Sequence, residues 1–158
     1  GRMVDLLECY MGLRRIATEP VRQLHKMWDN FFDKSSSDAR FLMIGSSQGI
    51  IHLRNALLDY SEDRRSRISA IAIAPAAYVY RETCAQVRHY RAESRWRDFI
   101  PRIDQAGAKR ESRSITDLPS HPDAPYFDHY IDSPTYRSPL RRELKEFLKW
   151  TRWKWEFI

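Results

Sequence analysis

The segment Ala39-Arg-Phe-Leu-Met-Ile-Gly-Ser-Ser-Gln-Gly-Ile-Ile-His-Leu-Arg-Asn-Ala-Leu-Leu58 decides the fold that we expect for this chain. Residues 41–44 form a short continuous apolar run, which is typical of a strand buried on both faces. The next five residues, 45–49, fit the pattern Gly-x-Ser-x-Gly, and apolar residues then recur at helical spacing as far as Leu58. The segment therefore predicts a strand, a tight turn and a helix, with Ser47 on the turn.

The spacing of the two glycines around Ser47 has a chemical rationale. A serine on a sharply bent strand-to-helix turn points its hydroxyl outward, and we expect side chains at positions 45 and 49 to collide there. The free N–H groups and the dipole of a helix N-terminus favour negative charge, so the N–H of Gln48 is placed to bind an oxyanion. The pattern predicts a nucleophile elbow with Ser47 as nucleophile and Gln48 in the oxyanion hole. The alternative is a glycine-bracketed turn with an idle serine.

Length and composition indicate one globular domain, residues 1–158, because the chain is 42% hydrophobic and 30% charged. We divide it into a core, residues 18–140, and a basic, tryptophan-rich C-terminal helix and tail, residues 141–158. The net charge of +6 admits an anionic partner such as an acidic membrane surface. Without a signal-peptide pattern or a membrane-spanning run, we expect a cytoplasmic protein. The two cysteines, Cys9 and Cys84, have no metal-ligand spacing, and no metal or cofactor is expected.

The remaining pattern alternates helices and strands, which predicts an α/β fold with a mostly parallel sheet flanked by helices. Residues 4–16 suggest an amphipathic helix or an irregular lead-in. We expect helices over residues 18–32, 49–59 and 140–151, and strands over residues 41–44, 68–75, 85–90 and 114–118.

A nucleophilic serine needs a base, and the base needs a carboxylate that orients it. Asp98 follows the third predicted strand and is the first candidate for the acid, with Asp104 in reserve. For the base we prefer His129 to His121, because His129 immediately precedes the closing segment and the final helix. The other histidines lie within predicted helices or a strand and are better explained by packing or surface roles: His25, His52 and His89. The predicted catalytic set is Ser47, Asp98 and His129.

The elbow and the segment Asp98-Phe-Ile-Pro101 together resemble the α/β-hydrolase lipases, in which an Asp-x-Val/Ile-Pro turn often carries the triad acid. More closely, residues 18–140 resemble a chlamydial family of uncharacterised bacterial proteins with a hydrolase-like domain. The matching stretches are residues 47–49, 54–57, 72–76, 80–86, 96–101, 120–125 and 133–136. One departure is Ser46, since the residue before the serine is often histidine in that family.

A second departure concerns the residues before the elbow. A full α/β-hydrolase has several strands there, and one of their loops supplies the second oxyanion donor, whereas about forty residues precede the elbow here. The resemblance thus implies the C-terminal portion of an α/β-hydrolase fold, with a sheet that is reduced or completed by a second copy or a partner chain. The loss of one oxyanion donor costs roughly 10²–10³ in rate.

Two functions follow as hypotheses. The first is a serine hydrolase, an esterase, lipase or thioesterase that acts on a small-molecule ester or acyl substrate by acyl transfer to Ser47. The second is a catalytically inactive interaction protein on the same fold, which binds an anionic surface or a partner protein. Its basic–aromatic residues are Arg88, Arg91, Arg95, Trp96 and Arg97, together with the tryptophans of the tail. For these tryptophans we favour the alternative, a helix end that packs them on the core. Nucleic acid is disfavoured as a partner, because the chain has no zinc spacing and no helix-turn-helix or aromatic strand motif.

Overall fold

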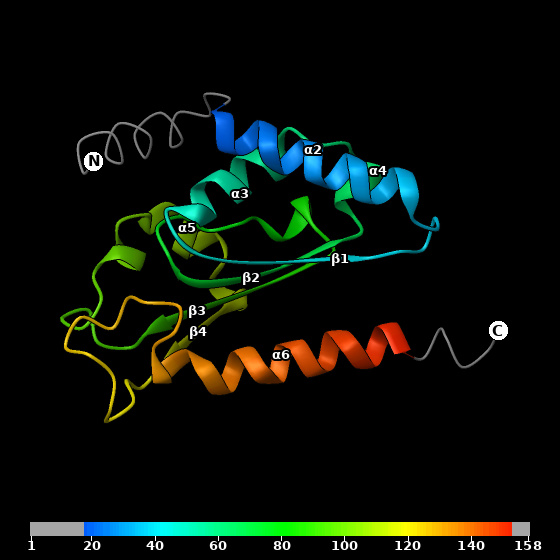
Figure 1. Ribbon diagram of the computed structural model, residues 1–158. Helices are drawn as coiled ribbons and strands as arrows, with labels where there is room; N and C mark the ends of the chain where they lie inside the picture. The colour runs from blue at the N-terminus through cyan, green and yellow to red at the C-terminus, as the bar shows by residue number, and fades with distance from the viewer. Residues whose placement is uncertain (1–17, 153–158) are drawn as a thin grey trace.

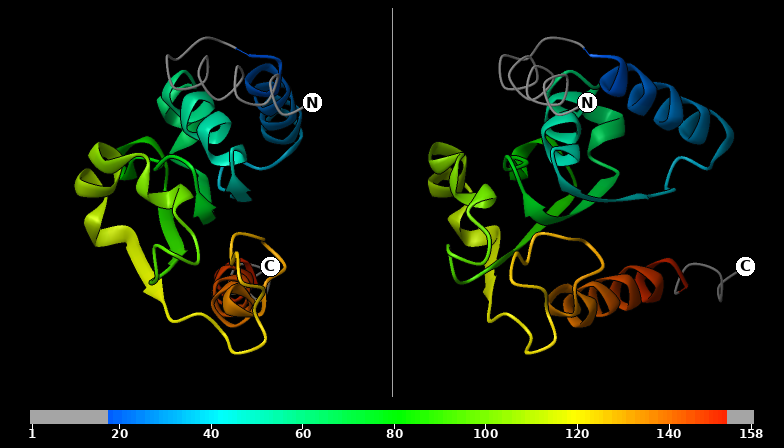
Figure 2. Two further views of the ribbon diagram at one scale, coloured as in Figure 1. Left: turned by 90° about the vertical axis from the view of Figure 1, so that its left-hand side faces the viewer. Right: turned by 60° about the vertical axis from the view of Figure 1, so that its left-hand side comes forward.

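The structure, a computed structural model that describes residues 18–152, has three layers (Figure 1). Helices α2 (Glu19–Lys34) and α3 (Gly49–Leu58) cover one face of the sheet, and α6 (Pro134–Arg152) lies on the other face (Figures 1 and 2). The sheet has four parallel strands in the order β1-β2-β3-β4. The strands are β1 (Phe41–Ser47), β2 (Ile68–Pro75), β3 (Gln86–Ala92) and β4 (Ile115–Leu118). The predicted class, a parallel α/β sheet flanked by helices, is confirmed.

Alternate residues of β2 build the two halves of the hydrophobic core. Ala70 and Ala72 belong to the cluster that includes Leu53 of α3, and their small side chains let this helix lie close to the sheet. Ile71 and Ile73 point the other way, into the cluster that contains Tyr136 and Leu140 of α6. The sheet is therefore held between the elbow helix and the C-terminal helix.

Residues 41–44 pack on both faces of the sheet, as expected, with Phe41 and Met43 on one core cluster and Leu42 and Ile44 on the other, but none of them is fully buried. All seven residues of β1 are only partly buried. The reason is that β1 is the first strand of the sheet and pairs only with β2 in the described part of the chain, so its other edge is not covered by a strand. The strand that carries the elbow is thus an edge strand here.

The element boundaries follow the sequence closely, with one large difference at the C-terminal helix. It begins at Pro134 rather than at residue 140, because proline suits the first turn of a helix, where its missing N–H is not needed. The Ser133 hydroxyl accepts the N–H of Thr135 at 3.3 Å and supports this start. Two short helices, α4 (Glu62–Arg65) and α5 (Gln105–Arg110), lie outside the expected helices and strands. Three 3-10 turns complete the described chain: Arg81–Thr83, Ile100–Arg102 and Ser112–Ser114. The predictions for residues 4–16 and 153–158 lie outside the described residues.

Candidate active site

Ser47 occupies a sharp turn between β1 and α3. Its φ is +50°, in the left-handed region that non-glycine residues rarely adopt, and only Ala74 shares this feature among the described residues. The pairing of β1 with β2 shifts at this point, so that Ser47 is opposite Pro75, and its carbonyl accepts the N–H of Ala76 at 3.1 Å. The strand, the strained turn and the helix are those of a nucleophile elbow.

The two glycines that flank Ser47 differ in what they do. A Cβ at Gly45 would lie 2.9 Å from Cδ1 of Ile50, a fully buried side chain of α3, so this position requires glycine for close packing. A Cβ at Gly49 would meet nothing within 4 Å. The expectation that a side chain at position 49 would collide is therefore wrong, because Gly49 already begins α3 and is exposed. Gln48 directly precedes α3, so its N–H belongs to the N-terminal end of that helix.

The structure brings the three predicted catalytic side chains together. Nε2 of His129 lies 2.7 Å from Oγ of Ser47, although the two residues are 82 positions apart. Nδ1 of the same imidazole lies 2.9 Å from both carboxylate oxygens of Asp98. Asp98 is 1% exposed and follows β3, and His129 lies in the loop that follows β4. The side chains thus come from the carboxyl ends of three parallel strands, which meet at one edge of the sheet.

The hydrogen-bond partners fix the tautomer of His129. A carboxylate can only accept, so Nδ1 must carry the proton that Asp98 receives. Nε2 is then the acceptor, and the Ser47 hydroxyl donates to it. This is the arrangement in which an imidazole can remove the proton of a serine.

Backbone contacts join the loops that hold Asp98 and His129. The N–H of Asp128 donates to the carbonyl of Arg97 at 2.8 Å, which links the residues adjacent to the acid and the base. The Arg97 guanidinium also donates to the carbonyls of Ala124 and Pro125 at 3.2 and 3.1 Å. These bonds fix the position of the His129 loop relative to the Asp98 loop, and none of them involves Ser47.

Asp128 is a positioning residue that the sequence reasoning missed. Its side chain is fully buried and accepts hydrogen bonds from the hydroxyls of Ser133 and Thr135, each at 2.6 Å. Its carbonyl accepts the hydroxyl of Tyr136 at 3.1 Å. Burial raises the pKa of Tyr136, and the charges of Asp98 and Asp128 raise it further, so this phenol stays protonated. The signal in the sequence is an aspartate followed by hydroxyl residues at a helix start, a pattern typical of a capped loop.

The structure separates the two reserve candidates from this site. Asp104 caps α5 by accepting the N–H of Gly107 at 2.9 Å, and it also accepts from the Tyr78 N–H and the Arg54 guanidinium. His121 accepts the N–H of Asp123 through Nδ1 at 3.1 Å and is turned to its own loop. Both residues therefore have structural partners of their own.

The remaining histidines take part in packing, as predicted. His89 is fully buried, and its Nε2 accepts the N–H of Val79 at 3.1 Å, so its proton is on Nδ1, beside the Ser114 hydroxyl. Burial lowers the pKa of His89 to about 4, which keeps the ring neutral. His25 stacks on Tyr60, and His52 lies buried within α3.

Exposed aromatic and apolar side chains lie on the two loops that carry Asp98 and His129. The ring of Phe127 lies 5.4 Å from that of His129 and 6.0 Å from that of Phe99. The large apolar side chains exposed on the two site loops and their continuations are Trp96, Phe99, Ile103, Tyr126, Tyr130 and Ile131. We call these six residues and Phe127 the aromatic rim. Exposed apolar groups beside the His129 ring favour an apolar ligand.

The proposed basic–aromatic cluster is not one surface. Arg88 lies near the amino end of β3 and lines a pocket under α6, whereas Arg95 stacks on Trp96 beyond the carboxyl end of that strand. Arg91 pairs with Asp117 and donates to the Tyr78 hydroxyl, so its charge is already neutralised within the fold. The expected cluster is therefore divided between the two ends of the sheet.

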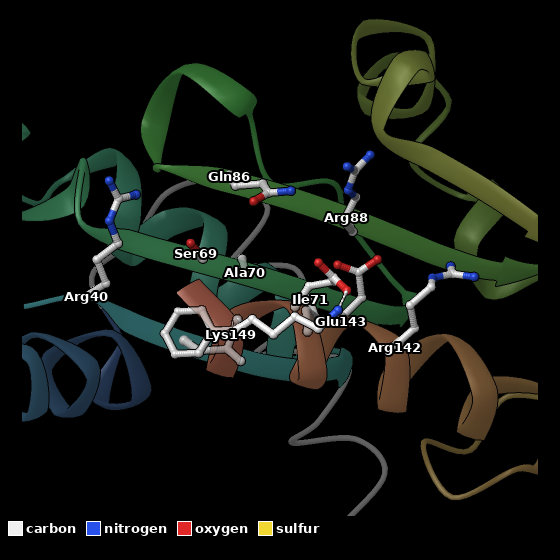
Figure 3. Close-up of a pocket in the computed structure, with 12 residues that line it drawn as sticks. Arg40, Ser69, Ala70, Ile71, Gln86, Arg88, Arg142, Glu143 and Lys149 are labelled. Carbon is white, nitrogen blue, oxygen red and sulfur yellow. Dashed lines mark hydrogen bonds and ion pairs between the residues drawn. The ribbon is translucent and has the colours of Figure 1, made fainter. Parts of the chain in front are cut away.

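The pocket under α6 has a volume of about 770 Å³ and lies at the amino ends of the strands, away from Ser47 (Figure 3). Its floor includes Ala70 and Ile71 of β2. The basic side chains come from both walls, Arg40 and Arg88 from the sheet side and Arg142 and Lys149 from α6. It contains none of the candidate catalytic residues, so it does not receive the group that Ser47 would attack.

Among residues 18–152, no three His, Cys, Asp or Glu side chains lie close enough together to hold a metal ion. Burial raises the pKa of the Cys84 thiol to about 12, so this cysteine is a poor nucleophile. No helix within these residues has the length and apolar character needed to cross a membrane.

The site must be interpreted from its own geometry. Comparison of the chain with protein-family models, with curated proteins and with solved structures finds no match.

Proposed function

We propose that this protein is a serine hydrolase that cleaves esters or thioesters through an acyl-enzyme on Ser47. One observation carries the proposal. The side chains of Ser47, His129 and Asp98 form a continuous hydrogen-bonded series, although they come from three segments that are far apart in the sequence. A strained backbone at the serine and a buried carboxylate at the far end of the series support it.

The proposed reaction has two halves. As Oγ of Ser47 bonds to the substrate carbonyl carbon, Nε2 of His129 takes the hydroxyl proton, and the N–H of Gln48 faces the developing oxyanion. The imidazolium, stabilised by Asp98, then gives this proton to the departing alcohol or thiol, and the acyl group stays on Ser47. Water attacks the acyl-enzyme with His129 again accepting a proton, and return of that proton to Oγ releases the carboxylic acid.

The aromatic rim favours an apolar acyl or leaving group. Trp96 and Tyr126 are 74% and 78% exposed, and Phe127 contacts the His129 ring directly. An apolar chain that lies across these rings gains roughly 0.8 kcal/mol for each CH₂ that it buries. We therefore expect kcat/KM to rise with acyl length, from acetyl to octanoyl esters of p-nitrophenol.

Two matched pairs of variants test the assignment. Asp98→Asn should lower kcat/KM for the octanoyl ester by on the order of 10⁴-fold because the imidazole loses its orienting carboxylate. Asp104→Asn should instead keep most of the activity and lower the melting temperature, since Asp104 caps α5. His129→Gln and His121→Gln form the second pair, with the large loss expected at His129 alone.

Two outcomes would contradict the proposal. One is equal activity in the Asp98→Asn and Asp104→Asn variants when both are folded by circular dichroism. The other is a folded natural chain that hydrolyses none of the esters, which would favour the inactive interaction protein.

A further inference from the structure

The outer face of α6 carries a row of basic side chains at intervals of four residues: Arg137, Arg141, Lys145 and Lys149. We call these four residues the basic stripe. All four are exposed, and they lie opposite Tyr136, Leu140 and Phe147, which pack toward the sheet. Residues at this spacing lie one above another on a helix, so the four charges share one side.

The charges of the basic stripe are largely unused within the fold. Within residues 18–152, Arg141 and Lys145 have no hydrogen bond or ion pair. Arg137 donates only to the carbonyl of Asp132, and Lys149 pairs with Glu146, one turn back along α6. Like charges at this spacing destabilise a helix, so the arrangement does not serve the stability of α6. An external anion is the partner that would compensate for it.

A groove beside the basic stripe is large enough to accept more than one anionic group. A shallow groove of about 670 Å³ is lined by all four stripe residues together with His121 and Arg142, and basic residues outnumber the two acidic ones in the lining, Asp123 and Glu146. This groove shares Arg142, Glu146 and Lys149 with the larger pocket under α6, where Arg40 and Arg88 add further positive charge (Figure 3). Basic side chains therefore extend from the groove, around α6, to the pocket beneath it.

The flanking residues favour lipid over nucleic acid. Leu148 is 57% exposed next to Lys149, so an apolar side chain accompanies the charges. A helix with basic residues and accessible apolar residues suits the boundary between water and lipid. In the sequence, Trp150, Trp153 and Trp155 follow with basic residues between them, a composition typical of the same boundary.

We propose that the basic stripe docks this protein on a membrane surface that contains anionic phospholipids. The charged heads of the stripe lie at the phosphate level, and Leu148 lies toward the acyl chains. This docking does not depend on the proposed catalytic activity, because it involves none of Ser47, Asp98 or His129.

The test measures co-sedimentation of the full chain with vesicles. Vesicles of phosphatidylcholine alone are compared with vesicles that contain 30% phosphatidylglycerol, at low and physiological salt. Each basic residue near an anionic surface contributes ~1 kcal/mol, so the double variant Arg141→Gln/Lys145→Gln should bind anionic vesicles roughly 30-fold more weakly. The matched control, Lys26→Gln/Lys34→Gln, removes the same charge from α2 on the opposite face of the sheet and should bind nearly as the natural chain does.

The folded state of each variant is checked by its melting temperature, which should not fall for the stripe variant because a like-charge contact is removed. A loss of the same size in the control variant would overturn the proposal, since net charge alone would then explain binding. Equal binding to neutral and anionic vesicles would also overturn it. So would tight binding to a DNA or RNA duplex without binding to anionic vesicles.

Discussion

Ser47 holds a left-handed backbone with φ of +50°, and the residues next to it must accommodate this bend. Such strain costs of order 1–3 kcal/mol and persists only where the surrounding structure enforces it. Here the hydrogen bond from the Ala76 N–H to the Ser47 carbonyl holds the bend, and the lack of a side chain at Gly45 leaves room for Ile50. The strain points the hydroxyl toward His129 instead of into the sheet.

The two glycines of the elbow should respond differently to alanine. Gly45→Ala places a methyl group 2.9 Å from the buried Ile50 side chain and should lower the free energy of unfolding by about 1–3 kcal/mol. Gly49→Ala meets no atom, and because alanine is the better helix former it should leave stability unchanged or raise it by up to ~1 kcal/mol. Urea unfolding followed by circular dichroism measures both. Equal losses in the two variants would contradict this account of the elbow.

At the scale of elements, the start of α6 and the loop before it form one unit that holds His129. The Asp128 carboxylate binds the hydroxyls of Ser133 and Thr135, at the first turn of the helix. A buried carboxylate with two such bonds is costly to disturb because neither partner can reach water. The position of the base therefore depends on the helix behind it.

Asp128→Asn should weaken both stability and catalysis. An amide presents N–H donors where one of the two hydroxyls now donates, so the free energy of unfolding should fall by about 1–3 kcal/mol. Its effect on catalysis should appear as a lower kcat for ester hydrolysis at a temperature where the variant is fully folded. The control is Asp132→Asn, which changes an exposed side chain of the same loop and should alter neither quantity. A stability loss without any change in kcat would show that Asp128 supports the loop alone.

The elements around the candidate site differ in how far the sequence predicts them. The turn at Ser47 was predictable because a strand, two glycines and a helix are local patterns. That an acid and a base after parallel strands meet at one edge of the sheet was also predictable. The choice of Asp98 over Asp104 and of His129 over His121 rested in addition on their places in the chain and on the resemblance of residues 98–101 to a hydrolase turn. The burial of β1 was not predictable, because it depends on which strands lie beside it. Asp128 was not predicted, because its partners follow a loop and the path of a loop has no periodic sequence pattern. The start of α6 at Pro134 was not predicted, because prolines usually indicate loops.

At the scale of the whole molecule, the buried His89 ties the stability of the fold to pH. The pKa of this ring is lowered by burial to about 4, whereas an exposed histidine has a pKa near 6.5. Between these values the unfolded chain binds a proton that the folded protein does not bind, so stability falls as the pH drops from 6.5 toward 4. Below about pH 4, His89 is protonated in both the folded and the unfolded chain, so its contribution to the free energy of unfolding no longer changes.

Between pH 7 and pH 4.5 the expected loss of unfolding free energy from His89 is about 2 kcal/mol, and urea unfolding at these two pH values measures it. Other groups also titrate in acid, so the natural chain must be compared with His89→Gln. The variant should be less stable at pH 7, because it disturbs the bonds to Val79 and Ser114, but it should lose less stability on acidification. A pH dependence identical in the two proteins would show that His89 does not contribute.

The central claim is that Ser47 is an activated nucleophile, and covalent labelling with a fluorophosphonate probe tests it most directly. The account predicts one adduct per chain, located by peptide mass spectrometry on Ser47 and not on the adjacent Ser46, and labelling that is lost in Ser47→Ala and slowed greatly in His129→Gln. Folded protein that takes up no probe, or that is labelled equally with and without Ser47, would contradict the claim.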